Sequence, residues 1–457
     1  MKLKLRGLAL ALLIVAFLAG SLAAAEHKLV SDTLPNGMKV YVLEDHNSPL
    51  VAVQIWVRTG GVNETYKTRG MSHFLEHLLF KGTKKRKVGE LDRELDAIGA
   101  SNNAATYYDY TFFQATGASC YFDKMLDVEV DGVLNSTLEP EEVEKERKVV
   151  IEEIKMNEDK PQRVLFSQIH RAMFDNLAYS YPVIGFQKII ETVPRDVIYN
   201  YYKEKYNPNN MIVVIVGDIK PEVAFAKVKE AFRGIVSNTP GNEKIDGALE
   251  EEIIKPRYRK VMMDIEKTYS SIAYRAPELA SDDIAAMEVL TNILGEGASS
   301  KLNVSVKEKQ KLVDVVAAAM WNFRSSGLFF VYMMLDPKNV ETAKDAVFKE
   351  IAAIKKGEIT SGEIEKAKNS IETAFILNHQ NYENMAEYIG QTILLSSEDN
   401  FGKYLENIKK VTKEDIVKVA NKYLTDNGYV FAVVEPNPKK AEAKAAKKME
   451  SGKVEKK

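Results

Sequence analysis

The segment MSHFLEHLLFKGT, residues 71–83, holds two histidines and one glutamate within five positions. If it is an α-helix, His73, Glu76 and His77 fall within an arc of about 100°, so their side chains can converge on one point. Two imidazoles on adjacent helical turns suit a tetrahedral zinc ion, and a nearby carboxylate that is not a ligand can take a proton from a zinc-bound water. The order H-x-x-E-H is the inverse of the commoner H-E-x-x-H. The spacing therefore predicts a zinc site on this helix.

The alternative interpretation is a helix with ordinary surface histidines. The neighbouring residues argue against it, because they make the other sides of the helix apolar. These neighbours are Phe74, Leu75, Leu78 and Leu79. A polar trio on such a helix would be partly buried and would need polar partners.

A catalytic zinc site needs a third protein ligand. The other four histidines are not distinguished by their sequence context, so a carboxylate is the better candidate. In the predicted helix EKERKVVIEEIKMNED, Glu146 and Glu153 are seven residues apart and lie within about 20° of one another, whereas Glu152 is turned away by about 100°. One of the pair could bind the metal while the other orients a ligand, and the geometry does not choose between them. Without the histidines, a solvated acidic helix face would be the default interpretation.

The elements that must position these residues follow from length and periodicity. A chain of 457 residues with 45% hydrophobic residues exceeds one compact domain, and two or three domains are expected. MKVYVLED and LVAVQIWVRTG have the alternation of strands, whereas residues 71–79 and 140–159 have helical spacing. The pattern predicts an α+β fold.

An internal repeat predicts two homologous domains. VPRDVIYNYYKEKYNPNNMIVVIVGDI, from Val193, is echoed by VTKEDIVKVANKYLTDNGYVFAVVEPN, from Val411, and each copy reads as helix, turn and strand. The preceding helices, EEVEKERKVVIEEIKMNED and SGEIEKAKNSIETAFILNHQN, also correspond. The predicted domains are residues 26–240 and 257–438, joined by a linker at 241–256 that is rich in Gly, Pro and charge.

The N-terminus has the features of a signal peptide over residues 1–25. Three basic residues precede the uncharged run 7–25, which ends in SLAAAEH, so cleavage is expected near Ala25. An uncleaved membrane anchor is the alternative, and it would be the chain's only membrane contact. Cys120 is the only cysteine, so no internal disulfide is possible. We expect an exported bacterial protein, periplasmic or secreted.

Charge is unevenly distributed along the chain. The first seven residues carry three positive charges and the Lys-rich tail, residues 439–457, carries a surplus of five, so the overall charge of −2 leaves −10 on residues 26–438. An acidic body argues against nucleic acid as a partner. The composition of the tail predicts disorder or loose helix.

The chain resembles the pitrilysin, or insulinase, family of zinc metallopeptidases, which includes the mitochondrial processing peptidase. The segments that carry the resemblance are RGMSHFLEHLLFKGTKKR, ERKVVIEEIKMNEDKP, NAATYYDYT and the internal repeat. The resemblance implies that His73 and His77 bind one zinc ion and that Glu76 is the general base, which activates the zinc water to attack a peptide carbonyl. It also implies that Glu153, 76 residues beyond His77, is the third ligand and that Glu146 supports the site from outside the ligand shell.

The resemblance further implies the architecture and the mode of substrate binding. Each domain would be a mostly antiparallel sheet packed with helices, as in the processing peptidase. The stretch NNAATYYDYTFFQATG, residues 102–117, matches the strand beside the zinc to which an extended peptide adds. Asn103 and Ala104 are the candidates for contact with substrate, although either could belong to an ordinary half-buried strand.

The second half departs from the family pattern. Where single-chain relatives carry an Arg and, seven residues later, a Tyr that hold the substrate, this chain has Lys307 and Asp314. A carboxylate cannot donate to an oxyanion. Arg324 and Tyr332 lie outside the matching segment, and MEVLTNILGEG, which aligns with the histidine helix, has no histidine. We therefore expect the catalytic subunit of a heteromer with a zinc-free homologue that carries the Arg and Tyr, or a homodimer, cleaving peptides or unfolded segments in an enclosed chamber. A non-catalytic structural or peptide-binding subunit is the alternative.

Overall fold

The computed structural model describes residues 28–175, 178–237 and 252–438. The predicted signal peptide, the Lys-rich tail and residues 241–251 of the predicted linker lie outside the described residues. Within the described ranges, no helix is both long and apolar enough to cross a membrane. The first half of the chain below means residues 28–237, and the second half means residues 252–438.

The first half contains a six-stranded sheet in the order β1-β2-β6-β3-β5-β4. Strands β2 and β6 run parallel, and the other neighbours are antiparallel. The strands are β1 (Leu29–Thr33), β2 (Lys39–Glu44), β3 (Leu50–Val57), β4 (Ser101–Thr106), β5 (Thr111–Ala118) and β6 (Met211–Gly217). Strand β4 lies at one edge, so its outer side is free to pair with another strand.

The second half contains a five-stranded sheet in the order β7-β11-β8-β10-β9. Its strands are β7 (Arg257–Met263), β8 (Thr268–Ala276), β9 (Val315–Asn322), β10 (Gly327–Leu335) and β11 (Tyr429–Pro436). Strands β7 and β11 are parallel and the rest are antiparallel. When β1 is left out, the remaining five strands of the first sheet have the same order and the same directions as the five strands of the second sheet. The two halves that are similar in sequence therefore also share a strand topology.

The first half has eight α-helices and the second half has six among the described residues. In the first half they are α2 (Met71–Leu79), α3 (Glu90–Asp96), α4 (Phe122–Asn135), α5 (Pro140–Glu158), α6 (Pro161–Met173), α7 (Gln187–Thr192), α8 (Arg195–Lys205) and α9 (Pro221–Ala231). In the second half they are α10 (Ile284–Gly295), α11 (Val340–Lys355), α12 (Ser361–Asn378), α13 (Tyr382–Leu395), α14 (Tyr404–Lys410) and α15 (Lys413–Tyr423). Helices α5 and α6 begin with a proline, which suits the first turn because it needs no backbone donor there.

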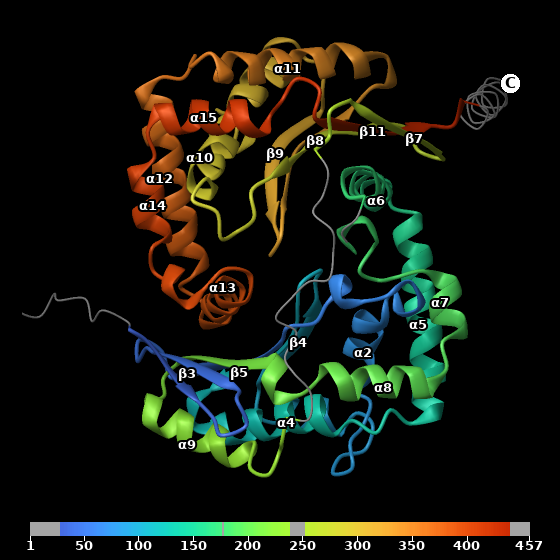
Figure 1. Ribbon diagram of the computed structural model, residues 1–457, viewed down its shortest axis with the longest axis vertical. Coiled ribbons are helices and arrows are strands. Elements are labelled where there is room, and N and C mark those ends of the chain that lie inside the picture. Colours follow the sequence, from blue (N-terminus) through green and yellow to red (C-terminus); the bar gives the residue numbers. More distant parts are fainter. Residues whose placement is uncertain (1–27, 176–177, 238–251, 439–457) are drawn as a thin grey trace, which may run out of the picture.

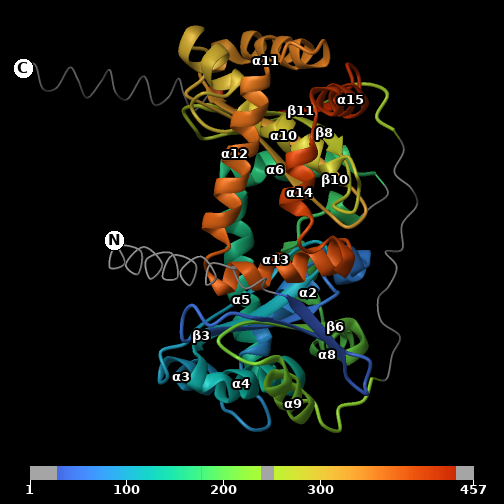
Figure 2. The same ribbon diagram turned by 90° about the vertical axis from the view of Figure 1, so that its left-hand side faces the viewer.

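The two halves exchange one helix each, as Figures 1 and 2 show. Helix α6 packs on β11 and β8 of the second sheet, and α13 packs on β3 and β6 of the first. The approach of α13 is very close, since a Cβ at Gly390 would lie 2.2 Å from the Trp56 ring. Each sheet thus carries helices of its own half on one face and a helix of the other half on the opposite face. The α+β prediction of two similar, mostly antiparallel units packed with helices is confirmed.

Candidate metal centre

Helix α2 is fixed at its N-terminus by a buried carboxylate. Glu64 accepts hydrogen bonds from the backbone N–H groups of Gly70, at 2.8 Å, and Ser72, at 2.7 Å. Gly70 has φ +92°, a conformation that favours glycine, and it allows the chain to turn sharply into the helix. These bonds satisfy N–H groups that have no partner inside the helix. Burial raises the pKa of Glu64 to about 7, and the two bonds act in the opposite direction. The cap holds α2 in a defined position.

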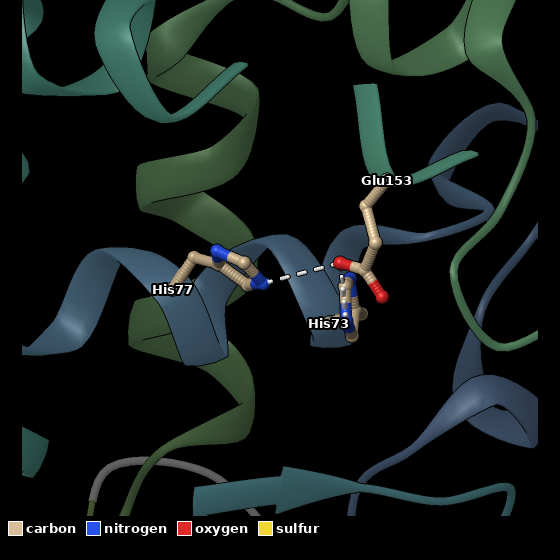
Figure 3. A group of neighbouring side chains, drawn as sticks. All are labelled: His73, His77 and Glu153. Atoms are coloured by element: carbon tan, nitrogen blue, oxygen red, sulfur yellow. Dashed lines mark ion pairs between the residues drawn. The ribbon is translucent and has the colours of Figure 1, made fainter. Parts of the chain in front are cut away.

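The apolar side of α2 turns the polar trio toward α5. Phe74, Leu75, Leu78 and Leu79 are fully buried. On the other side, both His73 Nε2 and His77 Nε2 lie 3.6 Å from the same Glu153 Oε2 (Figure 3). One donor atom from each of these three residues lies within 4.8 Å of the other two. The structure therefore brings together the three predicted metal ligands.

The spacing of these donors fits zinc better than it fits hydrogen bonding. A distance of 3.6 Å exceeds a normal hydrogen bond. It is close to the edge of about 3.4 Å that joins two ligands of a tetrahedral zinc ion with bonds of 2.0–2.1 Å. Two imidazole nitrogens and one carboxylate oxygen are also a donor set typical of catalytic zinc, so the residues present fit the ion that the sequence predicts.

Glu146 supports the site from behind His77, where its two oxygens have different partners. One oxygen lies 3.4 Å from His77 Nδ1, on the far side of the ring from Glu153, and the other lies 3.0 Å from Lys81 Nζ. A carboxylate in this position orients a metal-binding imidazole. Glu152, by contrast, is exposed and pairs with Lys155. Glu146 and Glu153 therefore face α2 while Glu152 faces away from it, as helical spacing predicts.

Glu76 lies on the same face of α2 and is held by strand β4. The Thr106 hydroxyl donates to Glu76 Oε2 at 2.6 Å. Burial raises the pKa of Glu76 above its usual value, although the Thr106 hydrogen bond acts in the opposite direction. A raised pKa makes the carboxylate a stronger base for a water proton.

The protonation of the other groups suits metal binding. Burial, together with the neighbouring His77, lowers the pKa of His73 to about 4, so this ring is neutral at pH 7. For His77, burial lowers the pKa, but Glu153, Glu76 and Glu146 outweigh it and raise the value. Contact with His77 is the main reason that the pKa of Glu153 is lowered. The pair therefore attracts a proton, or a cation, between the two residues.

The predicted substrate residues lie on β4, at the edge of the first sheet. Asn103 is exposed, and Ala104 is half-buried against the core. They pair with Gln114 and Phe113 of β5, which leaves the outer side of β4 open. Residues 102–117, matched in the sequence to one strand, are a hairpin of β4 and β5 with a turn at 107–110.

The residues of the second half that depart from the family pattern have local roles. Lys307 lies on the irregular helix Asn303–Lys309, and Asp314 forms an ion pair with Lys267 at 2.9 Å. Tyr332 is half-buried with its ring 6.5 Å from that of Phe166.

Two models of one peptidase family match consecutive parts of the chain. The model described as "Insulinase (Peptidase family M16)" matches residues 39–186. The model described as "Peptidase M16 inactive domain" matches residues 192–371. The chain belongs to peptidase family M16. This is the insulinase, or pitrilysin, family that the histidine motif and the repeat resemble.

Relatives of this M16 protein are named as zinc proteases. An uncharacterized zinc protease of Bacillus subtilis is 26% identical over 89% of this chain and 98% of the relative. One of Mycobacterium tuberculosis is 29% identical over 89% and 93% of the two chains. The crystal structure of a protease from Helicobacter pylori is 26% identical, with a TM-score of 0.85 over 90% of this chain and 99% of that chain. The chain therefore has the fold and the relatives of a zinc metallopeptidase.

Sequence reasoning did not single out two residues of the M16 site, Thr106 and Lys81. Thr106 is two positions beyond Ala104, so it lies on the same face of β4 and turns toward α2. Lys81 is four residues beyond His77 and two residues past the end of α2. Both spacings are visible in the sequence, but the partners Glu76 and Glu146 become evident only when β4 and α5 are placed against α2.

Proposed function

We propose that this chain is an active zinc endopeptidase in which His73, His77 and Glu153 hold the metal and Glu76 is the general base. The observation that carries the proposal is the convergence of both His Nε2 atoms on one Glu153 oxygen, with Glu76 beside them. A scaffold protein would have no reason to keep these polar groups together and partly buried.

Zinc in this position would polarise a peptide carbonyl and lower the pKa of water. Glu76 accepts a proton from the attacking water and passes it to the departing amine. The Thr106 hydrogen bond fixes the direction in which Glu76 points. Glu146 holds the ring of His77 so that Nε2 faces Glu153.

The substrate in this proposal is an extended peptide that adds to the edge of β4. Main-chain hydrogen bonds to an edge strand hold almost any sequence, which suits peptides and unfolded segments. Asn103 and Ala104, in the middle of the strand, point to opposite faces of the sheet that such a peptide would extend.

We propose further that the enzyme works as the catalytic subunit of a heteromer with a zinc-free homologue, or as a homodimer, after export and removal of residues 1–25. The pairing of Asp314 with Lys267, and the absence of Arg and Tyr at 307 and 314, support a need for groups from another chain. Chelator-sensitive cleavage of an unstructured peptide library by the purified chain, with zinc counted, tests this. Cleavage by a monomer would contradict the need for a partner.

The test of the catalytic role is Glu76→Gln, which keeps the shape of the side chain and removes its basicity. Hydrolysis should fall by about a thousandfold or more while one zinc per chain is retained. The control is Glu152→Gln on the exposed face of α5, which should change neither. Loss of zinc in Glu76→Gln would recast Glu76 as a ligand.

A non-catalytic binding subunit is the second candidate, and the departure at Lys307 and Asp314 favours it. It predicts peptide binding without turnover under every condition, including in the presence of a homologue that carries the Arg and Tyr. Hydrolysis that Glu76→Gln abolishes would exclude it.

A further inference from the structure

The turn between β4 and β5, residues 107–110, adjoins the general base. Thr106, directly before the turn, donates to Glu76, and it pairs across the hairpin with Thr111. The Thr111 hydroxyl donates to the Thr59 carbonyl oxygen at 2.9 Å. A displacement of the turn would therefore move the Thr106 hydroxyl relative to Glu76.

One side of the turn is held by the backbone of residues 60–62. Gly61 N–H donates to the Tyr107 carbonyl oxygen at 3.1 Å, and Val62 N–H donates to that of Tyr108 at 2.9 Å. A Cβ at Gly60 would lie 2.3 Å from the Tyr107 oxygen, so only glycine permits this approach.

The other side is held by Asp109, whose two oxygens have partners in different parts of the chain. One accepts a hydrogen bond from the Tyr179 hydroxyl at 2.7 Å, and the other accepts one from the backbone N–H of Arg324 at 3.1 Å. The Tyr179 oxygen in turn accepts from the N–H of Ser325 at 3.3 Å. Tyr179 follows α6, whereas Arg324 and Ser325 form the tip of the β9–β10 hairpin in the second half.

Packing around these bonds excludes water. Asp109 is 8% exposed and Tyr179 is fully buried. The Tyr179 ring stacks on Phe323 with centroids 4.6 Å apart, and Tyr108 stacks on His170 at 5.0 Å. Burial raises the pKa of Asp109 to about 6, while the hydrogen bond from Tyr179 acts in the opposite direction. A buried carboxylate that lost these donors would pay the full cost of desolvation, so the turn cannot shift alone.

We propose that Asp109, Tyr179, Arg324 and Ser325 form a latch through which the second half of the chain positions the general base. The latch holds the turn, the turn holds Thr106, and Thr106 directs Glu76. Asp109 and Tyr179 are positioning residues in this account, which rests on the proposed peptidase function. It gives the half without a zinc motif a part in positioning the general base.

The first test is Tyr179→Phe, which removes one hydroxyl and keeps the stacked ring. The expected loss in kcat is about ten- to a hundredfold, because small displacements of catalytic groups are costly. KM and zinc content should stay near the wild-type values. The control is Tyr202→Phe, which deletes another buried hydroxyl, bonded at 2.9 Å to the Val133 carbonyl oxygen, and should leave kcat unchanged.

The second test separates positioning from a general loss of stability. Thr106→Val removes the bond to Glu76, and Thr106→Ser restores it. If the latch acts through Thr106, the double variant Tyr179→Phe/Thr106→Val loses no more kcat than Thr106→Val alone. Losses that multiply would overturn the proposal.

Hydrogen exchange gives a readout that does not need turnover. Tyr179→Phe should speed exchange of the amides of residues 61–62, 107–110 and 324–325, and Tyr202→Phe should not. A wild-type chain that never cleaves peptides would overturn the proposed function but not the latch as a structural element. Unchanged exchange at these amides would overturn the latch itself.

Discussion

The helix pairs α2/α5 and α10/α12 occupy equivalent places in the two halves, yet of these described helices only the first pair carries candidate metal ligands. Alignment of the helix from Met287 with the helix from Met71 puts Val289, Asn292 and Ile293 at the positions of His73, Glu76 and His77. Alignment of the repeat in α5 and α12 puts Ala367 and Ala374 at the positions of Glu146 and Glu153. The candidate zinc site of the first helix pair and the packed second helix pair thus differ at these five side chains.

The comparison shows that the fold does not need the site. Val289, Asn292 and Ile293 are buried, and Asn292 has a local partner in Glu296 at 2.7 Å. In the first half His73 and His77 are partly exposed and lie 3.6 Å from Glu153 of α5, and Glu76 accepts a hydrogen bond from Thr106 of β4. The five shared strands have the same order and directions in both halves, so the candidate chemistry depends on a few substitutions placed on a duplicated sheet and helix pair.

Removing the proposed third ligand should have the largest effect on the difference between the two helix pairs. Glu153→Ala makes the first half resemble the second at that position. We expect zinc affinity to fall by more than about a hundredfold, which exceeds the usual loss for a residue outside the ligand shell. Chelator competition measures it, with Glu152→Ala as the matched control. Full zinc occupancy in Glu153→Ala would mean that another group is the third ligand.

A buried acid also separates the halves. Glu129 lies seven residues after the start of α4, is fully buried, and has no hydrogen-bond partner among the described residues. Counted from its start, α11 has Val347 in the same place, also buried. Burial raises the pKa of Glu129 to about 8, with a smaller contribution from Asp92.

This acid should make stability depend on pH. Between about pH 4.5 and 8 the folded chain keeps a proton that the unfolded chain has released, so the free energy of unfolding falls as pH rises through that window. Glu129→Gln should reduce this slope by the share of one proton, because other buried acids such as Asp109 titrate in the same window. Its advantage over wild type should grow to the order of a few kcal/mol at pH 8. Urea unfolding at pH 5 and pH 8 measures the difference. Parallel pH profiles for the two proteins would contradict the prediction.

Substitution of Gly390 tests whether the close packing of α13 on the first sheet contributes to stability. Gly390→Ala would place a methyl group against the Trp56 ring. Overpacking of this kind should destabilise the chain by about 1–3 kcal/mol, measured by thermal unfolding. Gly362→Ala in α12 is the control, because a Cβ there meets nothing within 4 Å. Equal stability of the two variants would show that α13 can move away from the sheet without cost.

The smallest expected effect is that of Lys81→Met, which removes the cation from Glu146 and keeps much of the side-chain volume. Zinc affinity should fall by about tenfold, because outer partners tune a metal site less than its ligands do. Lys81→Arg should restore most of it. An unchanged affinity would mean that Glu146 orients His77 without help.

Local periodicity was enough to predict the parts of the site that lie on one helix. Residues 71–79 and 140–158 are helices, as their spacing predicts, and Glu146 and Glu153 share a face while Glu152 does not. The choice of Glu153 over Glu146 as a ligand came from the family resemblance. Helical spacing alone could not make it, because it does not say how α5 lies on α2.

Contacts between segments that are distant in the chain could not be predicted from the sequence. The bond from Thr106 to Glu76 depends on how the β4–β5 hairpin lies against α2, and the exchange of α6 and α13 depends on packing across the whole chain. The repeat revealed two similar units but not that each sheet is completed by a helix from the other. The similarity between the two repeats does not indicate on which of the two sheets a given helix packs.

The covering of Trp56 by α13 has a consequence for the order of events during synthesis. Gly390 leaves the ribosome more than 300 residues after Trp56, and until then this face of the first sheet lacks the α13 side chains that pack on it. Contacts with such a large separation form late and leave apolar surface open to aggregation. The half that carries His73 and His77 is translated first, yet its sheet is fully covered only after α13 has emerged.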